Sequence, residues 1–224
     1  MISTTKVNII NNVKWTIDKS FSFCYGHRVH NQRLDTKFTE SGDACLACRH
    51  LHGHEGLVKV FLTGDNKNVE TTGMVTDFKH LGWFKNFLDD TLDHKFIMDL
   101  KDPLFKEEFP IMCSSSEADG IYIDLSYMHK MDQGYYVPDL TRIKKFCSDL
   151  PRTPSEQDAI FEKYEGAVFV DFVPTSENLA AWLLRVCQEK MKGLEGVKVQ
   201  AIEYWETPKS HCRVETNNET YITK

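Results

Sequence analysis

The sequence predicts an antiparallel α+β fold, and three observations support this class. Several segments rich in β-branched and aromatic residues are typical of strands. Two other segments place apolar residues at the spacing of an amphipathic helix. Strands and helices alternate too few times along the chain for a doubly wound sheet, so an antiparallel sheet with helices explains the order better.

Four segments are predicted to be strands. A polar loop from Asn31 to about Arg49 follows the first of them, and the turn signal Gly64-Asp65-Asn66 ends the second. After the last one, the tail from Pro208 is polar. The four segments are residues 13–26, Gly56–Thr63, Met74–Phe78 and Val197–Trp205.

Two amphipathic helices are predicted from apolar spacing. The first covers residues 79–92. The second begins at the capping signature Pro174-Thr175-Ser176-Glu177 and ends at Gly193. Their apolar stripes are Leu81, Phe84, Phe87, Leu88 and Leu92 in the first helix, and Leu179, Leu183, Val186, Cys187 and Met191 in the second.

Composition limits the class of protein. With 224 residues the chain suits one domain, and its net charge of −6 disfavours a nucleic-acid partner, which usually requires a basic face. No apolar run approaches the length of a membrane helix, and the first residues lack the apolar stretch of a signal peptide, so we expect a cytoplasmic protein without a membrane partner. The odd count of seven cysteines favours reduced thiols.

Three histidines form the strongest local signal. His52 and His54 are separated by Gly53, and on an extended segment side chains two residues apart point to the same face. His27, at the end of the preceding strand, completes a His₃ set that would bind Zn²⁺ and leave one position open. His30 and His50 lie nearby and are alternative ligands.

Two carboxylates stand where they could take part in chemistry. Asp93 precedes His94 at the end of the first predicted helix, and a carboxylate bonded to a histidine fixes its tautomer and suits it to proton transfer. Glu206 ends the last predicted strand, where it could accept paired N–H groups from a flat, amide-like ring. A capping histidine and a surface glutamate are the plainer alternatives.

Read in order, these pieces resemble the 6-pyruvoyltetrahydropterin synthase superfamily, over roughly residues 15–99 and 172–213. The resemblance implies the tunnelling fold, an antiparallel sheet with two helices on one face, in a homo-oligomer (hexamer or tetramer) with active sites between subunits. The matching motifs are Phe23-Cys24-Tyr25-Gly26-His27-Arg28, Cys48-Arg49-His50-Leu51-His52-Gly53-His54, Gly73-Met74-Val75-Thr76-Asp77-Phe78, Leu92-Asp93-His94, Pro174-Thr175-Ser176-Glu177-Asn178 and Glu206-Thr207.

The position of one cysteine narrows the resemblance. Cys48 stands four residues before His52, which is similar to the 6-carboxy-5,6,7,8-tetrahydropterin synthases of the queuosine (7-deazaguanine) pathway. The 6-pyruvoyltetrahydropterin synthases typically place their cysteine where this chain has Leu46. The resemblance therefore implies conversion of 7,8-dihydroneopterin triphosphate to 6-carboxytetrahydropterin, acetaldehyde and triphosphate, with the 6-pyruvoyl reaction as the alternative.

The resemblance also implies a role for each candidate residue. The thiol would move a proton at the substrate side chain, the Asp–His pair would act as a second acid/base group, and the glutamate would anchor the pterin ring. These residues are His27, His52 and His54 for Zn²⁺, Cys48, Asp93 and His94 for catalysis, and Glu206 for the pterin.

The chain departs from the family pattern at three places. Tyr25-Gly26 replaces small residues before the first histidine, and Glu55-Gly56 replaces an aromatic residue after the last one. A segment at about 100–171 stands where the family has a short connection, so we expect a single domain over 1–224 interrupted by an insertion. The insertion is expected to lid the site or to pack on the outside of the oligomer.

A second alternative is a protein without enzymatic activity. Cys45 and Cys48 form a C-x-x-C pair, which would join His52 and His54 in a closed tetrad around a structural zinc ion. Such a protein would be a zinc-stabilised binding module. A zinc ribbon would need a second ligand pair elsewhere, and a redox motif would need a strand and a helix on either side.

Overall fold

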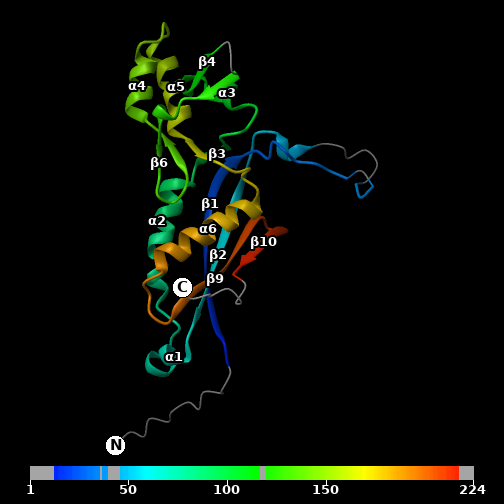
Figure 1. Ribbon diagram of the computed structural model, residues 1–224, viewed down its shortest axis with the longest axis vertical. Coiled ribbons are helices and arrows are strands. Elements are labelled where there is room, and N and C mark those ends of the chain that lie inside the picture. The colour runs from blue at the N-terminus through cyan, green and yellow to red at the C-terminus, as the bar shows by residue number, and fades with distance from the viewer. Residues whose placement is uncertain (1–12, 36, 40–45, 117–119, 217–224) are drawn as a thin grey trace, which may run out of the picture.

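One mixed sheet is the centre of the computed structural model, which describes residues 13–35, 37–39, 46–116 and 120–216. Within that part of the chain the strand order is β10-β9-β2-β1-β3-β8-β7-β6, and the long strands β1, β2 and β9 lie below the helices α4 and α5 in Figure 1. The strands are β1 (Trp15–His27), β2 (His52–Gly64), β3 (Lys95–Asp99), β6 (Met128–Lys130), β7 (Tyr136–Pro138), β8 (Ala167–Val170), β9 (Val197–Thr207) and β10 (Ser210–Glu215).

The sheet is parallel at its centre and antiparallel on both sides of it, since β6 and β7 also pair antiparallel and β7 pairs antiparallel with β8. Strands β1, β2, β9 and β10 pair antiparallel, as predicted. Strand β3 pairs parallel to β1, and β8 pairs parallel to β3. The expectation of a purely antiparallel sheet is therefore corrected to a mixed sheet, because the helix that follows β2 returns the chain to the edge of β1 in the direction of β1.

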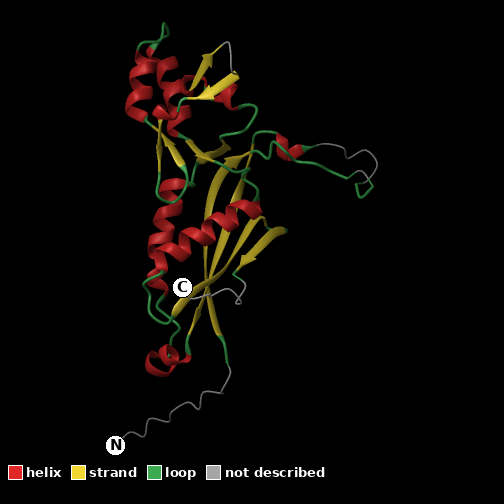
Figure 2. Ribbon diagram, in the orientation of Figure 1, coloured by secondary structure: helices red, strands yellow, loops and turns green. Residues whose placement is uncertain are grey.

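Two helices cover one face of the long strands (Figure 2). They are α2 (Gly82–Thr91) and α6 (Ser176–Met191), close to the two predicted helices. Phe84 and Leu88 of α2 and Leu183 of α6 are fully buried in one cluster with the inward side chains of β1, β2 and β9. The apolar stripes seen in the sequence thus form the main core.

Three predicted details differ from the structure. Met74–Phe78 is not a strand, because Asp77 accepts a bond from Lys79 N–H and caps a 3₁₀ helix at Phe78–Leu81. The predicted turn after β2 leads into a short helix, α1 (Asn66–Thr72), which is capped by Asp65. The tail contains a further strand, β10, whose alternating exposed and half-buried residues lie at the sheet edge.

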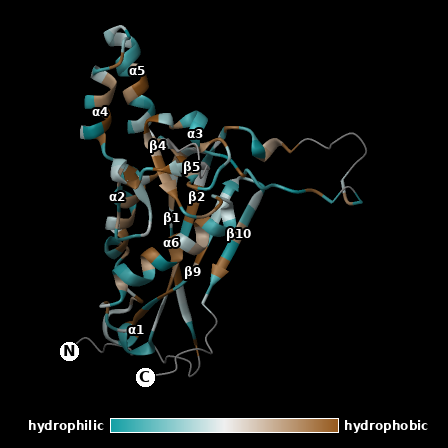
Figure 3. Ribbon diagram, turned by 45° about the horizontal axis from the view of Figure 1, so that its top comes forward, coloured by the Kyte–Doolittle hydropathy of each residue, from teal (hydrophilic) through white to brown (hydrophobic). Residues whose placement is uncertain are grey.

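The insertion builds a second core. Phe109, Met112, Tyr164 and Phe169 lie in a buried cluster separate from the main one, and Figure 3 shows hydrophobic and hydrophilic residues side by side along its two longer helices. Its further elements are α3 (Phe105–Glu108), a 3₁₀ helix at Pro110–Met112, β4 (Cys113–Ser116), β5 (Gly120–Ile123), a 3₁₀ helix at Leu125–Tyr127, α4 (Leu140–Ser148) and α5 (Pro154–Glu165).

The insertion is continuous with the main sheet. Its strands β6, β7 and β8 extend the sheet beyond β3. Where it begins and ends, Leu100 N–H donates to the Val170 carbonyl at 2.8 Å. It therefore adds strands to the sheet as well as a separate cluster above it (Figure 1). No helix in the described ranges is long and apolar enough to cross a membrane.

Candidate metal centre and active site

Three histidines meet where β1 ends and β2 begins. The antiparallel register places His27 opposite His52 and Tyr25 opposite His54. Because side chains alternate along a strand, His27, His52 and His54 all point to one face. One ligand nitrogen from each lies within 4.8 Å of the others, and neither His30 nor His50 belongs to this group. The sequence therefore selected the three histidines that the fold brings together.

Glycines let the two strands approach beneath the histidines. A Cβ atom on Gly53 would lie 2.7 Å from the Tyr25 carbonyl oxygen, and one on Gly26 would lie 2.7 Å from Cδ2 of Phe96. Real Cβ atoms do not approach so closely, so both positions require glycine for the present backbone path. Gly53 thus fixes the separation of the two ligands on either side of it.

The hydrogen bonds of the imidazoles set their tautomers. His27 Nδ1 donates to the Pro174 carbonyl at 2.7 Å, and His52 Nδ1 donates to the His50 carbonyl at 2.8 Å. A proton on Nδ1 leaves the Nε2 lone pair free for a metal. The Nε2 atoms of His27 and His54 are buried and have no hydrogen-bond partner among the described residues.

These unpaired nitrogens fit a metal ion. Burial lowers the pKa of His27 to about 4, so its ring is neutral near pH 7. Burial also lowers the pKa of His54, although the Glu206 carboxylate opposes this shift. Neutral imidazoles without other partners are zinc ligands, and three of them leave a position for substrate.

Glu206 lies beside the cluster at the end of β9. Its Oε1 atom is 3.4 Å from His27 Nε2 and 3.6 Å from His54 Nε2, and its side chain is 23% exposed. The carboxylate thus stands at the mouth of the histidine cluster, where it can meet a ligand. The buried hydroxyls of Tyr25 and Tyr204 adjoin each other close to Glu206, and burial raises the pKa of both.

Cys48 is presented by a 3₁₀ turn at Ala47–Arg49 and is half-buried. Burial raises the pKa of its thiol, and the Glu206 carboxylate raises it further. Because Glu206 also contacts the histidines, it links the thiol to the cluster electrostatically. Cys48 is not among the three ligands that meet, and Cys45 of the alternative closed tetrad lies outside the described residues.

Asp93 and His94 form the predicted hydrogen-bonded pair, but they lie away from the three-histidine cluster. Asp93 Oδ2 lies 2.9 Å from His94 Nδ1, and Asp93 Oδ1 accepts from Cys24 N–H at 2.7 Å. His94 has a φ of 57° and its side chain is 81% exposed. Neither residue belongs to the three-histidine cluster. In the single chain the pair therefore lies beside β1, apart from the three histidines, with the His94 ring exposed.

Several contributors were not found in the sequence. The Pro174 carbonyl orients His27, and Gln32 binds the backbone of Cys48. Arg28 Nε lies 3.2 Å from Asp102 Oδ2 in a buried ion pair just after the ligand His27. Each is brought to the site by a turn or by the insertion, and only the Pro174 motif gave a signal in the sequence, as a helix start.

Comparison with known proteins identifies the family. A sequence model described as 6-pyruvoyl tetrahydropterin synthase matches residues 16–217. The chain is 35% identical over 99 residues to a 6-carboxy-5,6,7,8-tetrahydropterin synthase from Aquifex aeolicus (strain VF5), a match over 42% of the chain and 59% of that relative. A solved structure of an uncharacterized protein from Wolinella succinogenes is 43% identical, with a TM-score of 0.74, over 92% of the chain and 99% of that protein.

The match to the family model spans both parts of the main sheet and the insertion between them. The likeness in structure extends over nearly the whole of the Wolinella protein, so the insertion is shared with at least one solved relative. The predicted α+β tunnelling fold is confirmed, and the chain belongs to the 6-pyruvoyl tetrahydropterin synthase family.

Proposed function

We propose that the chain is a zinc-dependent 6-carboxy-5,6,7,8-tetrahydropterin synthase. It would convert 7,8-dihydroneopterin triphosphate and water to 6-carboxytetrahydropterin, acetaldehyde and triphosphate. Family membership and the similarity to the Aquifex enzyme support this reaction. The position of Cys48, four residues before His52, supports the carboxy branch. The product would enter 7-deazaguanine (queuosine) synthesis in the cytoplasm.

The histidine cluster carries the proposal. Two of its three Nε2 atoms are buried without a partner, which is costly unless a ligand binds them. His27, His52 and His54 would hold Zn²⁺, which supplies a Lewis acid able to polarise a hydroxyl or carbonyl oxygen of the substrate. The bonds from Nδ1 to backbone carbonyls hold two of the rings in the orientation that this requires.

The remaining residues have separate tasks. The Cys48 thiolate would take a proton from the substrate side chain and return it as a thiol. Glu206 would accept N–H groups of the pterin ring, and its place at the mouth of the cluster supports this. Asp93 would hold His94 as a second acid/base group on the other side of the substrate.

The exposure of His94 supports an active site that is completed between subunits. A proton-transfer group that is 81% exposed stands in bulk water, whereas enclosure in a subunit interface would hold it against a substrate. We therefore infer a homo-oligomer, a hexamer or tetramer, in which His94 of one copy would face the metal centre of another. Size-exclusion chromatography with light scattering tests this, and an active monomer would contradict it.

Product analysis tests the reaction. Zinc-loaded protein is incubated with 7,8-dihydroneopterin triphosphate, beside a Cys48→Ala variant of equal zinc content. We expect acetaldehyde and 6-carboxytetrahydropterin from the parent chain and neither from the variant. Turnover that survives in the variant would remove Cys48 from the mechanism.

The sister reaction is the second candidate, because the matching family model carries the 6-pyruvoyl description. The same incubation separates the two, since a 6-pyruvoyl product without acetaldehyde would identify the sister enzyme. Zinc bound with no turnover of the substrate would instead favour the structural zinc module.

A further inference from the structure

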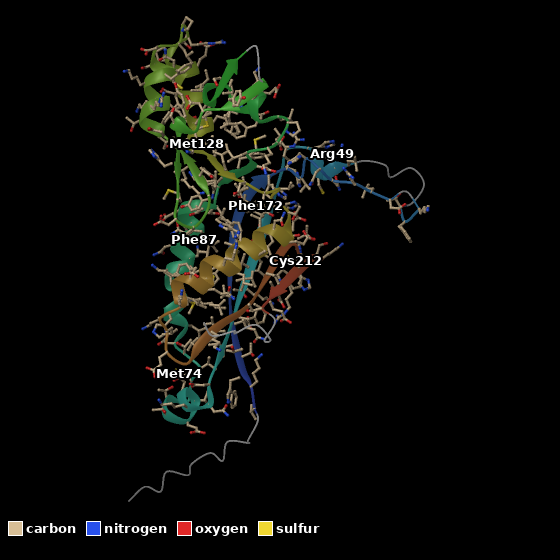
Figure 4. The ribbon with its side chains drawn as sticks, in the orientation of Figure 1. Arg49, Met74, Phe87, Met128, Phe172 and Cys212 are labelled. Atoms are coloured by element: carbon tan, nitrogen blue, oxygen red, sulfur yellow. The ribbon has the colours of Figure 1, made fainter. Side chains whose placement is uncertain are left out.

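The segment that follows His27 packs against the turn that carries Cys48. Val29 N–H donates to the Cys48 carbonyl at 2.6 Å, and Gln32 N–H donates to the Val29 carbonyl at 3.1 Å. The two pieces of chain therefore form a small backbone-bonded unit beside the metal centre. It lies at the base of the arm that projects from the sheet, where Arg49 is labelled (Figure 4).

Gln32 holds this turn by its side chain and by its backbone. Its Oε1 atom accepts from Cys48 N–H at 3.0 Å. The guanidinium of Arg49 donates to its carbonyl oxygen from Nε at 3.0 Å and from Nη2 at 2.6 Å. The turn at Ala47–Arg49 has no side-chain cap of its own, so Gln32 supplies the partner that the first amides of such a turn need.

A buried ion pair and a histidine–carboxylate hydrogen bond hold the other end of the segment. Arg28 is 7% exposed and faces Asp102, which is 4% exposed. His30 Nε2 lies 3.0 Å from Asp99 Oδ2. Both carboxylates stand where β3 leads into the insertion. A shift of the segment would break these two contacts, so they fix the position from which Gln32 binds Cys48.

We propose that Gln32 is the positioning residue for the Cys48 thiol, holding its turn and donating an amide N–H to the thiolate. This inference rests on the proposed function, in which Cys48 moves a proton. The planar amide has committed its oxygen to Cys48 N–H, which leaves its NH₂ group beside the same residue. The hydrogen bond from Gln32 thereby acts against two effects on the pKa of the Cys48 thiol. Burial and the Glu206 carboxylate raise its pKa, whereas the hydrogen bond from Gln32 lowers it.

The test measures the thiol without substrate. Zinc-loaded full-length protein is alkylated with iodoacetamide over a range of pH, and modification of the Cys48 peptide is followed by mass spectrometry. The exposed Cys24 is the reference thiol in the same digest. Because no turnover is involved, the result stands even if the enzyme proves to catalyse another reaction.

Two variants separate holding the turn from tuning the thiol. Gln32→Glu keeps an oxygen for Cys48 N–H but replaces the amide donor with a negative charge, whereas Gln32→Leu removes the oxygen and the donor without adding charge and so controls for the charge. We expect the alkylation midpoint of Cys48 to rise by about one unit in Gln32→Glu, a tenfold loss of thiolate well below the midpoint. The rate there would fall only about threefold, because a more basic thiolate is a better nucleophile.

In Gln32→Leu we expect a similar shift together with loss of turnover. Cys24 should alkylate at the parent rate in both variants, and zinc content should be unchanged. A Gln32→Glu midpoint equal to the parent's would overturn the proposal, since the turn would then be held without any effect on the thiol. Equal midpoints together with parent turnover in both variants would exclude both roles.

Discussion

The imidazole of His27 donates its Nδ1 proton to the carbonyl oxygen of Pro174 across 2.7 Å. The two residues are 147 positions apart in the chain. The carbonyl belongs to the stretch that leads into α6, whose first turn is capped by Thr175. The start of this helix therefore orients a ligand of the metal centre, and the two sequence motifs act as one structural unit.

Loss of a single ligand should abolish metal binding. His27→Asn and His54→Asn each leave only two imidazoles, which cannot hold zinc in a four-coordinate site. We expect bound zinc, measured by plasma mass spectrometry after dialysis, to fall from ~1 per chain to below ~0.1. His50→Asn is the control, because only the backbone of His50 contacts the site. Zinc loss in the control, or its retention in His27→Asn, would assign the ligands differently.

Gly53→Ala should disturb the same site through the backbone. The new Cβ would lie 2.7 Å from the Tyr25 carbonyl oxygen, so the strands must separate, at a cost of about 1–3 kcal/mol in the free energy of unfolding. Zinc affinity should fall with it. Gly82→Ala is the matched control, because nothing lies within 4 Å of its Cβ. We expect that variant to be as stable as the parent or more so, by urea denaturation.

Tyr25→Phe should change the free energy of unfolding much less than Tyr164→Phe. The buried Tyr25 hydroxyl adjoins the Tyr204 hydroxyl without meeting the geometry of a full hydrogen bond, so its removal should change stability by less than ~0.5 kcal/mol. The Tyr164 hydroxyl accepts from Ile111 N–H at 3.0 Å, so its removal should cost about 1 kcal/mol. Thermal melts of both variants decide this. A marked loss in Tyr25→Phe would mean that its hydroxyl binds a water or ligand.

Asp93 should stabilise the fold only above acidic pH. The bond from Cys24 N–H, followed by the contact with His94, lowers the pKa of Asp93 below its ordinary 3.8. A depressed carboxyl pKa contributes stability above the unfolded value and loses it as the pH falls through the folded value. Asp93→Asn should therefore lower the urea midpoint near neutral pH, and the gap to the parent should close as the pH falls below 3.8 and through the lowered pKa of the folded state.

Asp89→Asn provides the comparison for Asp93→Asn. Asp89 pairs with Lys85 on the exposed surface of α2, and such pairs contribute little to stability. We expect the Asp89 variant to follow the parent at every pH. A constant gap between Asp93→Asn and the parent down to acidic pH would show that charge is not the cause.

The histidine cluster was predictable because it depends on strand periodicity and on one register. His52 and His54 share a face by their spacing, and His27 ends a segment whose composition predicts a strand. The two main helices were predictable for a similar reason, since Phe84, Leu88 and Leu183 recur at helical spacing. Periodicity in the sequence was sufficient to predict these elements, because their buried faces are the ones that the periodicity defines.

Other features depend on contacts that no local pattern reports. Asp77 resembles the end of a strand in sequence, and only its bond to Lys79 N–H shows that it caps a turn. The parallel pairing of β3 required knowledge of where the chain returns after α2. Gln32 is an ordinary polar loop residue until Cys48 is placed beside it. The positions of Asp93 and His94 likewise depend on the bond that Asp93 accepts from Cys24 of β1, which their own sequence does not report.

The bond between Leu100 N–H and the Val170 carbonyl makes the insertion a loop whose two ends already touch. The entropy lost on closing a loop grows slowly with its length, by about 0.6 kcal/mol for each doubling. Chain length can therefore vary at this point with little effect on the strands that bear the histidines. Excision of the whole segment is a different change, because it would also remove β8 from beside β3 and Asp102 from beside Arg28.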